Sequence, residues 1–215
     1  MTETIKRTIE NLNKNKMETF FVEDRAEALK MALSLLNEGD TVSVGGSVTL
    51  SEIGMLDALK RGNYNYLDRY AASSPSEMHE IFRKSFFADA YITSSNAVTE
   101  NGELYNVDGN ANRVAAMMYG PKKVIVIVGK NKIVKDLDAA VLRVKTVAAP
   151  LNCKRLNKET YCVKTGHCVT VDNGEAHKMG VGCRSKDRIC RNFTVIGEHL
   201  PDRIKVIIVN EYLGY

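Results

Sequence analysis

A run of branched aliphatic residues near the middle of the chain restricts the fold more than any other feature. Residues 122–129 read KKVIVIVG, so five Val and Ile side chains follow one another without a polar residue between them. Successive side chains of a strand point to opposite faces of a sheet, so both faces of this strand should be buried. We therefore predict that residues 122–129 form a central strand of a parallel sheet covered by helices.

Strands and helices are expected to alternate along the first third of the chain. Apolar residues of the first segment recur at spacings of four and three, which is typical of one helix face. Asp24 is a suitable N-cap for the second helix, and Thr49 and Glu52 have the spacing of a capping box in the third. This rhythm predicts the α/β class with a mostly parallel sheet and flanking helices. The expected elements are helix 2–16, strand 19–23, helix 24–39, strand 41–46 and helix 47–62.

The remaining elements follow the same alternation less regularly. Pro75 favours the first turn of a helix, and Asn101-Gly102 is a strong signal for a hairpin turn. Pro150 is expected to end a helix that begins near residue 136. The expected elements are strand 64–70, helix 74–87, strand 88–94, hairpin 97–109, helix 110–120, helix 136–148 and strands 192–197 and 204–210.

Composition indicates one folded domain over residues 1–215, with a cysteine-rich excursion at about 151–191. Hydrophobic residues make up 44% and charged residues 26% of the 215 residues, a balance typical of folded proteins. The charged N-terminal segment does not resemble a signal peptide, and no apolar stretch is long enough to cross a membrane. We therefore expect a cytoplasmic protein with no membrane segment.

The charge pattern favours anionic small molecules over nucleic acid as partners. The net charge is only +4, and no basic run with interleaved aromatic residues occurs along the chain. The sequence therefore disfavours nucleic acid as a partner, unless a basic patch assembles in three dimensions.

Four of the five cysteines lie in a short polar span and suggest a metal site. Their pattern is C-x5-C-x14-C-x6-C, with Cys153 upstream. In a reducing compartment, clustered cysteines indicate metal binding or catalysis more than disulfides. Buried inert thiols are the plain alternative, and the sequence leaves iron–sulfur and zinc both open. The expected ligands are Cys162, Cys168, Cys183 and Cys190.

Two further stretches suggest a ligand pocket. Gly45, Gly46 and Ser47 lie between a strand and a helix, where backbone N–H groups attract anions; a plain turn explains these residues equally well. Residues 94–113 concentrate carboxylate, amide and guanidinium groups at another strand end, which suits a polar pocket or a polar turn. Within them Glu100 is the candidate general base, and Asp108 is either a ligand or a helix cap. The other candidate substrate-binding residues are Asn96, Gly109, Asn112 and Arg113.

Several of these stretches resemble the LUD, or lactate-utilisation, domain family. The similarity rests on VSVGGSVTLSEIGMLDALKRG, on ADAYITSSNAVTENGELYNVDGNANRVAAMMYGPKKVIVIVGKNKIV and on the cysteine-containing segment. It implies a fold resembling glucosamine-6-phosphate deaminase, ribose-5-phosphate isomerase and CoA-transferases. The fourteen residues between Cys168 and Cys183 are longer than in the family pattern, so Cys153 is an alternative ligand.

The resemblance leads to three functional hypotheses. The first is an iron–sulfur protein that acts in oxidation of lactate or a related organic acid, with a redox-protein partner. The second is an isomerase- or transferase-like enzyme on an anionic metabolite, with Glu100 as base and a structural zinc. The third is a non-catalytic subunit of a redox complex. Self-association into a homo-oligomer is compatible with each of them.

Overall fold

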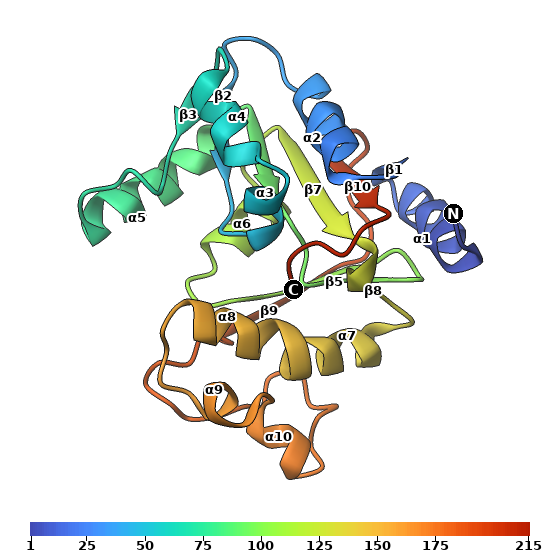
Figure 1. Cartoon of the computed structure of the whole chain (residues 1–215), viewed down its shortest axis with the longest axis vertical. Coiled ribbons are helices and arrows are strands. Elements are labelled where there is room, and N and C mark those ends of the chain that lie inside the picture. The colour runs from blue at the N-terminus through green and yellow to red at the C-terminus, as the bar shows by residue number, and fades with distance from the viewer.

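The computed structural model describes residues 1–215 and contains two sheets (Figure 1). The larger sheet has six strands in the order β1-β10-β7-β4-β2-β3, and every neighbouring pair in it is parallel. The predicted α/β class and mostly parallel sheet are therefore confirmed. The strands are β1 (Glu18–Val22), β2 (Thr41–Val44), β3 (Asn65–Leu67), β4 (Ala90–Thr93), β7 (Lys123–Gly129) and β10 (Ile204–Val209).

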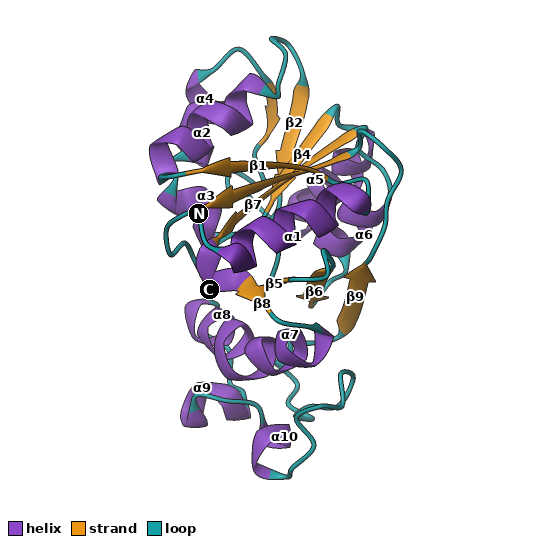
Figure 2. Ribbon diagram, turned by 90° about the vertical axis from the view of Figure 1, so that its right-hand side faces the viewer, coloured by secondary structure: helices purple, strands orange, loops and turns teal.

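Helices cover both faces of the larger sheet. One face packs against α2 (Arg25–Ser34), α3 (Val48–Glu52) and α4 (Met55–Arg61), and the other packs against α1 (Glu3–Lys14) and α6 (Asn112–Met118). Helix α5 (Pro75–Lys84) begins at the proline that suggested it and continues into the short η1 (Ser85–Phe87). Figure 2 shows the sheet nearly edge-on between these helices.

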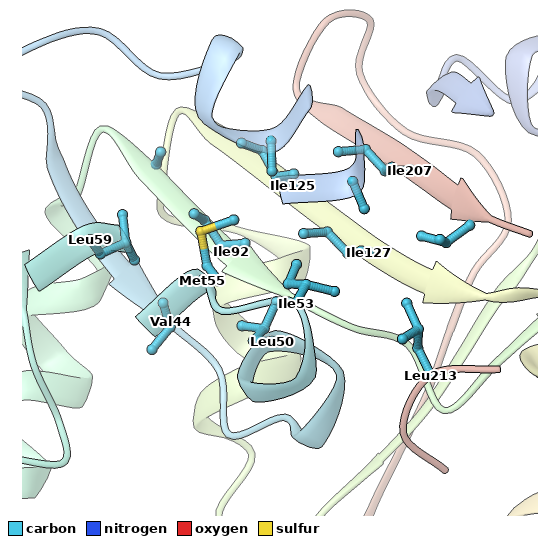
Figure 3. Close-up of a cluster of buried hydrophobic side chains, with 14 of the residues drawn as sticks. Val44, Leu50, Ile53, Met55, Leu59, Ile92, Ile125, Ile127, Ile207 and Leu213 are labelled. Carbon is cyan, nitrogen blue, oxygen red and sulfur yellow. The ribbon is translucent and has the colours of Figure 1, made fainter. Parts of the chain in front are cut away.

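Strand β7 occupies the central position that its sequence predicted. Ile125 and Ile127 point into the cluster under α2–α4, shown in Figure 3, while Val124, Val126 and Val128 point into the cluster under α1 and α6. All five side chains are fully buried. The uninterrupted apolar run is thus required by two cores, one on each side of the same strand.

The start of α3 differs from the prediction. Ser47 is the N-cap, and its hydroxyl accepts a hydrogen bond from the Leu50 N–H at 3.4 Å, so the predicted capping box of Thr49 and Glu52 is wrong. Gly54 has φ +76° and divides the expected helix 47–62 into α3 and α4.

The smaller sheet contains the predicted hairpin. Strands β5 (Ala97–Thr99) and β6 (Leu104–Asp108) are antiparallel and meet at a turn in which Gly102 has φ +82°. Strand β8 (Ile133–Val134) pairs in parallel with β5, and β9 (Asn192–Ile196) pairs antiparallel with β6. A second sheet was not expected from the sequence.

Pro150 does not end a helix as predicted. Helix α7 (Leu137–Arg143) continues through a π-helical turn (Val144–Ala148) into α8 (Ala149–Arg155), with Pro150 in the first turn of α8. The proline ring would clash with a carbonyl in a regular α-helix, and the wider π turn before it avoids that clash. Two short helices, α9 (Tyr161–Thr165) and α10 (Val169–Asp172), lie beyond α8 in Figure 1.

The helices of this structure are too short or too polar for any of them to cross a membrane.

Replacing Ile127 with Ala should lower the free energy of unfolding by about 2–5 kcal/mol, because it leaves a cavity in a fully buried layer. Urea unfolding followed by circular dichroism measures this change. Leu200→Ala is the control, since Leu200 is 70% exposed and should change the free energy little. Equal effects of the two substitutions would contradict the assignment of β7 to the core.

Candidate functional site

One continuous helix separates two cavities of opposite character. On α8, Asn152 and Arg155 line a polar pocket, while Cys153, between them, lines an apolar cavity that contains the cysteines. In Figure 1 the larger sheet lies on one side of α7 and α8, and α9 and α10 lie on the other.

The polar pocket lies at the carboxyl ends of β2 and β4. These strands are parallel, with Val44 opposite Ile92, so the segments that follow them meet at the same edge of the sheet. We call this the inner pocket; it has a volume of about 80 Å³, and only three of its 13 lining residues are hydrophobic. Its lining includes Gly46 and the polar residues Ser47, Ser94, Asn96, Asp108, Arg113, Lys132 and Arg155.

The glycine pair after β2 has two different roles. A Cβ atom at Gly45 would lie 2.6 Å from the Thr93 hydroxyl, so only glycine lets β2 approach β4 this closely. Gly46 has more room and lines the inner pocket. The prediction that Gly45 itself binds substrate therefore finds no support in its position, because it does not line the pocket.

Arg113 is buried beneath the inner pocket and is fully engaged. Its guanidinium donates to Asp108 Oδ1 at 3.1 Å, to the carbonyls of Ser94 and Val107 at 3.1 Å each, to Asn96 Oδ1 at 3.1 Å and to Asn106 Oδ1. These bonds use all five N–H groups of the side chain. Arg113 therefore positions the pocket and contributes charge to it, but it has no free donor for a ligand.

Asp108 acts as a cap, one of the two roles considered for it. Its Oδ2 accepts the backbone N–H groups of Arg113 and Val114 at 3.0 and 3.1 Å, at the start of α6. Its Oδ1 accepts from the Arg113 side chain. The carboxylate still lines the pocket, but its charge is balanced by Arg113.

Lys132 is the feature of the inner pocket that sequence reasoning missed. It follows β7 in a single 3₁₀ turn and is only 3% exposed. Its ammonium donates to Thr49 Oγ1 and to Ser94 Oγ, both at 2.9 Å, and it forms no ion pair with a carboxylate. Its only sequence signal is a lysine three residues after the end of the most apolar strand, where a polar side chain reaches the strand-end edge.

The surroundings of Lys132 disfavour its charged form. Burial lowers the pKa of Lys132 to about 7, and the nearby charges of Arg143 and Arg113 act in the same direction. Glu52 opposes this shift only weakly. An anion bound in the inner pocket would restore the charged form, because it supplies the missing opposite charge.

Glu100 lies away from both cavities. Its carboxylate forms an ion pair with Arg7 of α1, and its backbone carbonyl accepts a hydrogen bond from the Asn11 side chain at 2.8 Å. Glu100 lines neither the inner pocket nor the larger cleft into which the inner pocket opens. The geometry therefore gives no support to Glu100 as a general base for a ligand in this pocket.

The inner pocket opens into a larger space that we call the outer cleft. This cleft has a volume of about 540 Å³ and shares Gly46, Asn96, Arg113 and Arg155 with the inner pocket. Two predicted binding residues, Gly109 and Asn112, line it, and so does Cys190. Its remaining charged residues are Arg69, Asp108, Lys158, Lys186, Asp187, Arg188 and Arg191.

All five cysteines line one cavity, which we call the cysteine cavity. The sulfurs come from α8, α9, the start of α10 and the loop before β9, and the cavity has a volume of about 30 Å³. Its other lining residues are mostly apolar, with Lys145 and Arg188 as the two cations. All five thiols are free. The structure therefore brings together the four predicted ligands and also Cys153.

The thiols of the cysteine cavity influence one another. A hydrogen bond from Cys153 lowers the pKa of Cys162, and the Thr160 hydroxyl, 3.2 Å from the sulfur, acts in the same direction. Burial raises the pKa of Cys190 to about 12, with a further contribution from Cys162 and Cys168. Cys162 thus becomes a thiolate more readily than Cys153 or Cys190.

The cysteine cavity fits a thiophilic metal by donor type and by its size. Thiolate sulfurs suit zinc and iron, and about 30 Å³ is room for a single ion. No group of three or more His, Cys, Asp or Glu side chains has the geometry of a metal site in this structure.

Comparisons with known proteins agree with this architecture. The profile of the LUD domain family matches residues 5–209. A DUF162 family protein from Deinococcus radiodurans has a similar structure, with 18% identity, 97% of each chain covered and a TM-score of 0.55. At this identity the similarity shows the fold alone. No curated protein sequence matches the chain.

Two other solved structures are similar over part of their length. One is eIF2B delta from Chaetomium thermophilum, with 21% identity, 62% of this chain and 54% of that chain covered, and a TM-score of 0.36. The other is ribose 5-phosphate isomerase A from Methanocaldococcus jannaschii, with 17% identity, 53% and 55% covered, and a TM-score of 0.34.

Replacing Gly45 with Ala should lower the free energy of unfolding by about 1–3 kcal/mol, because the added methyl group would overlap the Thr93 hydroxyl. Thermal or urea unfolding measures the change. Gly197→Ala is the matched control, since a Cβ atom there meets nothing within 4 Å. A Gly45→Ala protein as stable as the control would show that β2 and β4 can separate without cost.

Proposed function

Because this chain belongs to the LUD domain family, we propose that it binds the carboxylate of a small organic acid, lactate or a close relative, in the inner pocket. Lys132 carries this proposal. Its buried ammonium lies at the strand-end edge of the sheet, hydrogen-bonded only to two hydroxyl groups and without a carboxylate partner. A buried cation without an opposite charge is costly unless a ligand provides one.

The charge balance around the inner pocket supports an anion. Lys132, Arg113 and Arg155 line the pocket, and Asp108 is its only acidic residue. Asp108 is already paired with Arg113, so two positive charges remain for a ligand. Arg155 is held in position by the Tyr215 hydroxyl at 2.7 Å and by Asn152 Oδ1 at 2.8 Å, neither of which removes its charge.

The volume of the inner pocket supports a small ligand. About 80 Å³ is room for a few water-sized groups, which suits an acid with few heavy atoms. Ser47 and Ser94 offer hydroxyl groups for the remaining oxygen atoms of such an acid. Lys132, whose pKa is lowered to about 7, would take up a proton when the acid binds above neutral pH, so that its ammonium pairs with the carboxylate.

Oxidation of lactate is the reaction that we propose for this ligand. It removes two protons and two electrons, and it yields pyruvate. The hydroxyl proton would pass to solvent, and the second proton and both electrons would pass to a redox-protein partner, while the Lys132 ammonium holds the carboxylate. The isomerase- or transferase-like alternative has less support, because the base expected for it, Glu100, pairs with Arg7 instead.

The cysteine cavity belongs to the proposal as a metal site. Cys162, Cys168, Cys183 and Cys190 are the ligands that we propose, with Cys153 as the alternative fourth. A zinc ion there would stabilise the loop, and an iron–sulfur cluster would transfer electrons. Lys145 and Arg188 would offset the negative charge of metal-bound thiolates in either case.

The affinity for lactate and pyruvate should fall as pH rises through about 7. Lys132 is mostly charged below its pKa and mostly neutral above it, so binding an anion at higher pH requires uptake of a proton. The affinity for these acids should fall by up to about tenfold for each pH unit above 7. Isothermal titration calorimetry at about pH 6 and about pH 8 measures it.

Lys132→Met should bind these acids weakly, with an affinity that no longer depends on pH over this range. Lys135→Met is the matched control, because Lys135 is exposed and lines none of the three cavities. Unchanged affinity in Lys132→Met, or a pH-independent affinity in the native protein, would contradict the proposal.

Protein purified without oxygen should contain metal bound by the cysteine cavity. Metal and sulfide analysis with an absorption spectrum distinguishes the two candidates: zinc without colour, or iron with sulfide and broad absorption. Replacing Cys162 and Cys190 with Ser should remove the metal, whereas Cys153→Ser should retain it if Cys153 is not a ligand. Metal-free native protein that remains metal-free after reconstitution would contradict the metal site.

A further inference from the structure

The outer cleft concentrates positive charge to a degree that the small acid of the inner pocket does not require. Seven basic and two acidic side chains line it, an excess larger than the net charge of +4 of the whole chain. The rest of the molecule is therefore slightly negative, and the cleft is where its field attracts anions.

Both acidic side chains of the outer cleft are already paired. Asp108 binds Arg113 at 3.1 Å, and Asp187 lies 3.8 Å from Lys158. The other basic residues have no carboxylate partner: Arg69, Arg155, Lys186, Arg188 and Arg191. An anionic ligand can therefore bind there without displacing an existing ion pair.

Neutral groups hold several of these cations in place. The Arg69 guanidinium lies over the Phe82 ring at 4.6 Å. Arg155 donates to the Tyr215 hydroxyl, and Arg188 donates to the carbonyl of Cys190 at 2.7 Å and to that of Gly180 at 2.9 Å. These contacts restrict the side chains without pairing them with a carboxylate, which is the arrangement that phosphate-binding arginines need. Arg188 also lines the cysteine cavity, so its charge is shared with that site.

We propose that the outer cleft binds an organic diphosphate, such as a nucleoside diphosphate, next to the small acid of the inner pocket. A diphosphate carries enough negative charge to pair with several guanidinium groups at once, whereas a single carboxylate does not. A volume of about 540 Å³ is typical of small-molecule sites. Met78, Leu156 and Ile189 also line the cleft and offer an apolar surface to the organic part of the ligand.

The lining of the outer cleft favours such a ligand over nucleic acid. No aromatic side chain lines it, so it lacks the platforms on which unpaired bases stack. Its basic residues surround a bounded volume that is continuous with the inner pocket, since both share Asn96, Arg113 and Arg155. The proposed diphosphate site is independent of which acid occupies the inner pocket.

The test is calorimetric titration of the full chain with ADP and, separately, with inorganic pyrophosphate. Both should bind, ADP more tightly because of its organic part, and added salt should weaken both. The double variant Lys186→Gln/Arg191→Gln should weaken ADP binding about tenfold or more, since it removes two charge-assisted contacts. Both side chains are exposed at the cleft, so the variant is expected to fold.

A matched control comes from the same part of the chain. Lys164→Gln/Arg184→Gln removes the same charge from exposed positions outside the cleft and should leave ADP affinity unchanged. Lactate affinity should persist in the Lys186→Gln/Arg191→Gln variant and fall in Lys132→Met. A failure of this proposal can therefore be told apart from a failure of the inner-pocket proposal.

Several outcomes would overturn the diphosphate site. One is the absence of saturable ADP binding. Another is a protein that binds pyrophosphate but not ADP. A third is an equal loss of ADP affinity in the cleft variant and in its control. Displacement of ADP by a short oligonucleotide at lower concentration would also overturn it, because it would identify a nucleic-acid surface.

Discussion

The buried guanidinium of Arg113 connects the two sheets, and the geometry of both ligand spaces depends on it. From α6 it binds the carbonyl of Ser94 at the end of the larger sheet and Asn106 and Val107 within β6 of the smaller one. Its ion pair with Asp108 also fixes the start of α6. Because every N–H group of Arg113 is used, the strand-end segments are held rigidly, and free charge for ligands has to come from other residues. Lys132 and Arg155 fill that role in the inner pocket.

The fold was largely predictable because its signals are local. The apolar run of β7, the turn at Asn101-Gly102 and the cap at Asp24 each act within a few residues, and each appears in the structure as expected. Pro150 misled the prediction, because a widened turn before it lets the helix continue. The second sheet was also missed, since the pairing of β9 with β6 joins segments about 85 residues apart.

The site was less predictable because its parts come from separate segments. The cations of the outer cleft belong to residues 69, 113, 155–158 and 186–191, so the sequence contains no basic run to indicate them. Spacing suggested that four cysteines act together, but only the fold brings Cys153 to the same cavity. Glu100 was chosen for its polar neighbourhood, which proved to be a hairpin turn that faces α1.

The π turn at residues 144–148 precedes the residues of α8 that face the two cavities. Each residue rotates an α-helix by about 100°, so a single added or deleted residue turns everything after it by that angle. The π turn is the exception, because it contains about one residue more than the α-helical turn that it replaces. Loss of one residue there would restore a regular α-helix and keep Cys153 and Arg155 facing the cavities that they line now. It would also bring the ring of Pro150 against a carbonyl of that regular helix, which is the clash that the π turn avoids. A deletion of one residue at 144–148 would thus preserve the directions of the acid-binding and thiol-bearing sites and strain the helix that separates them.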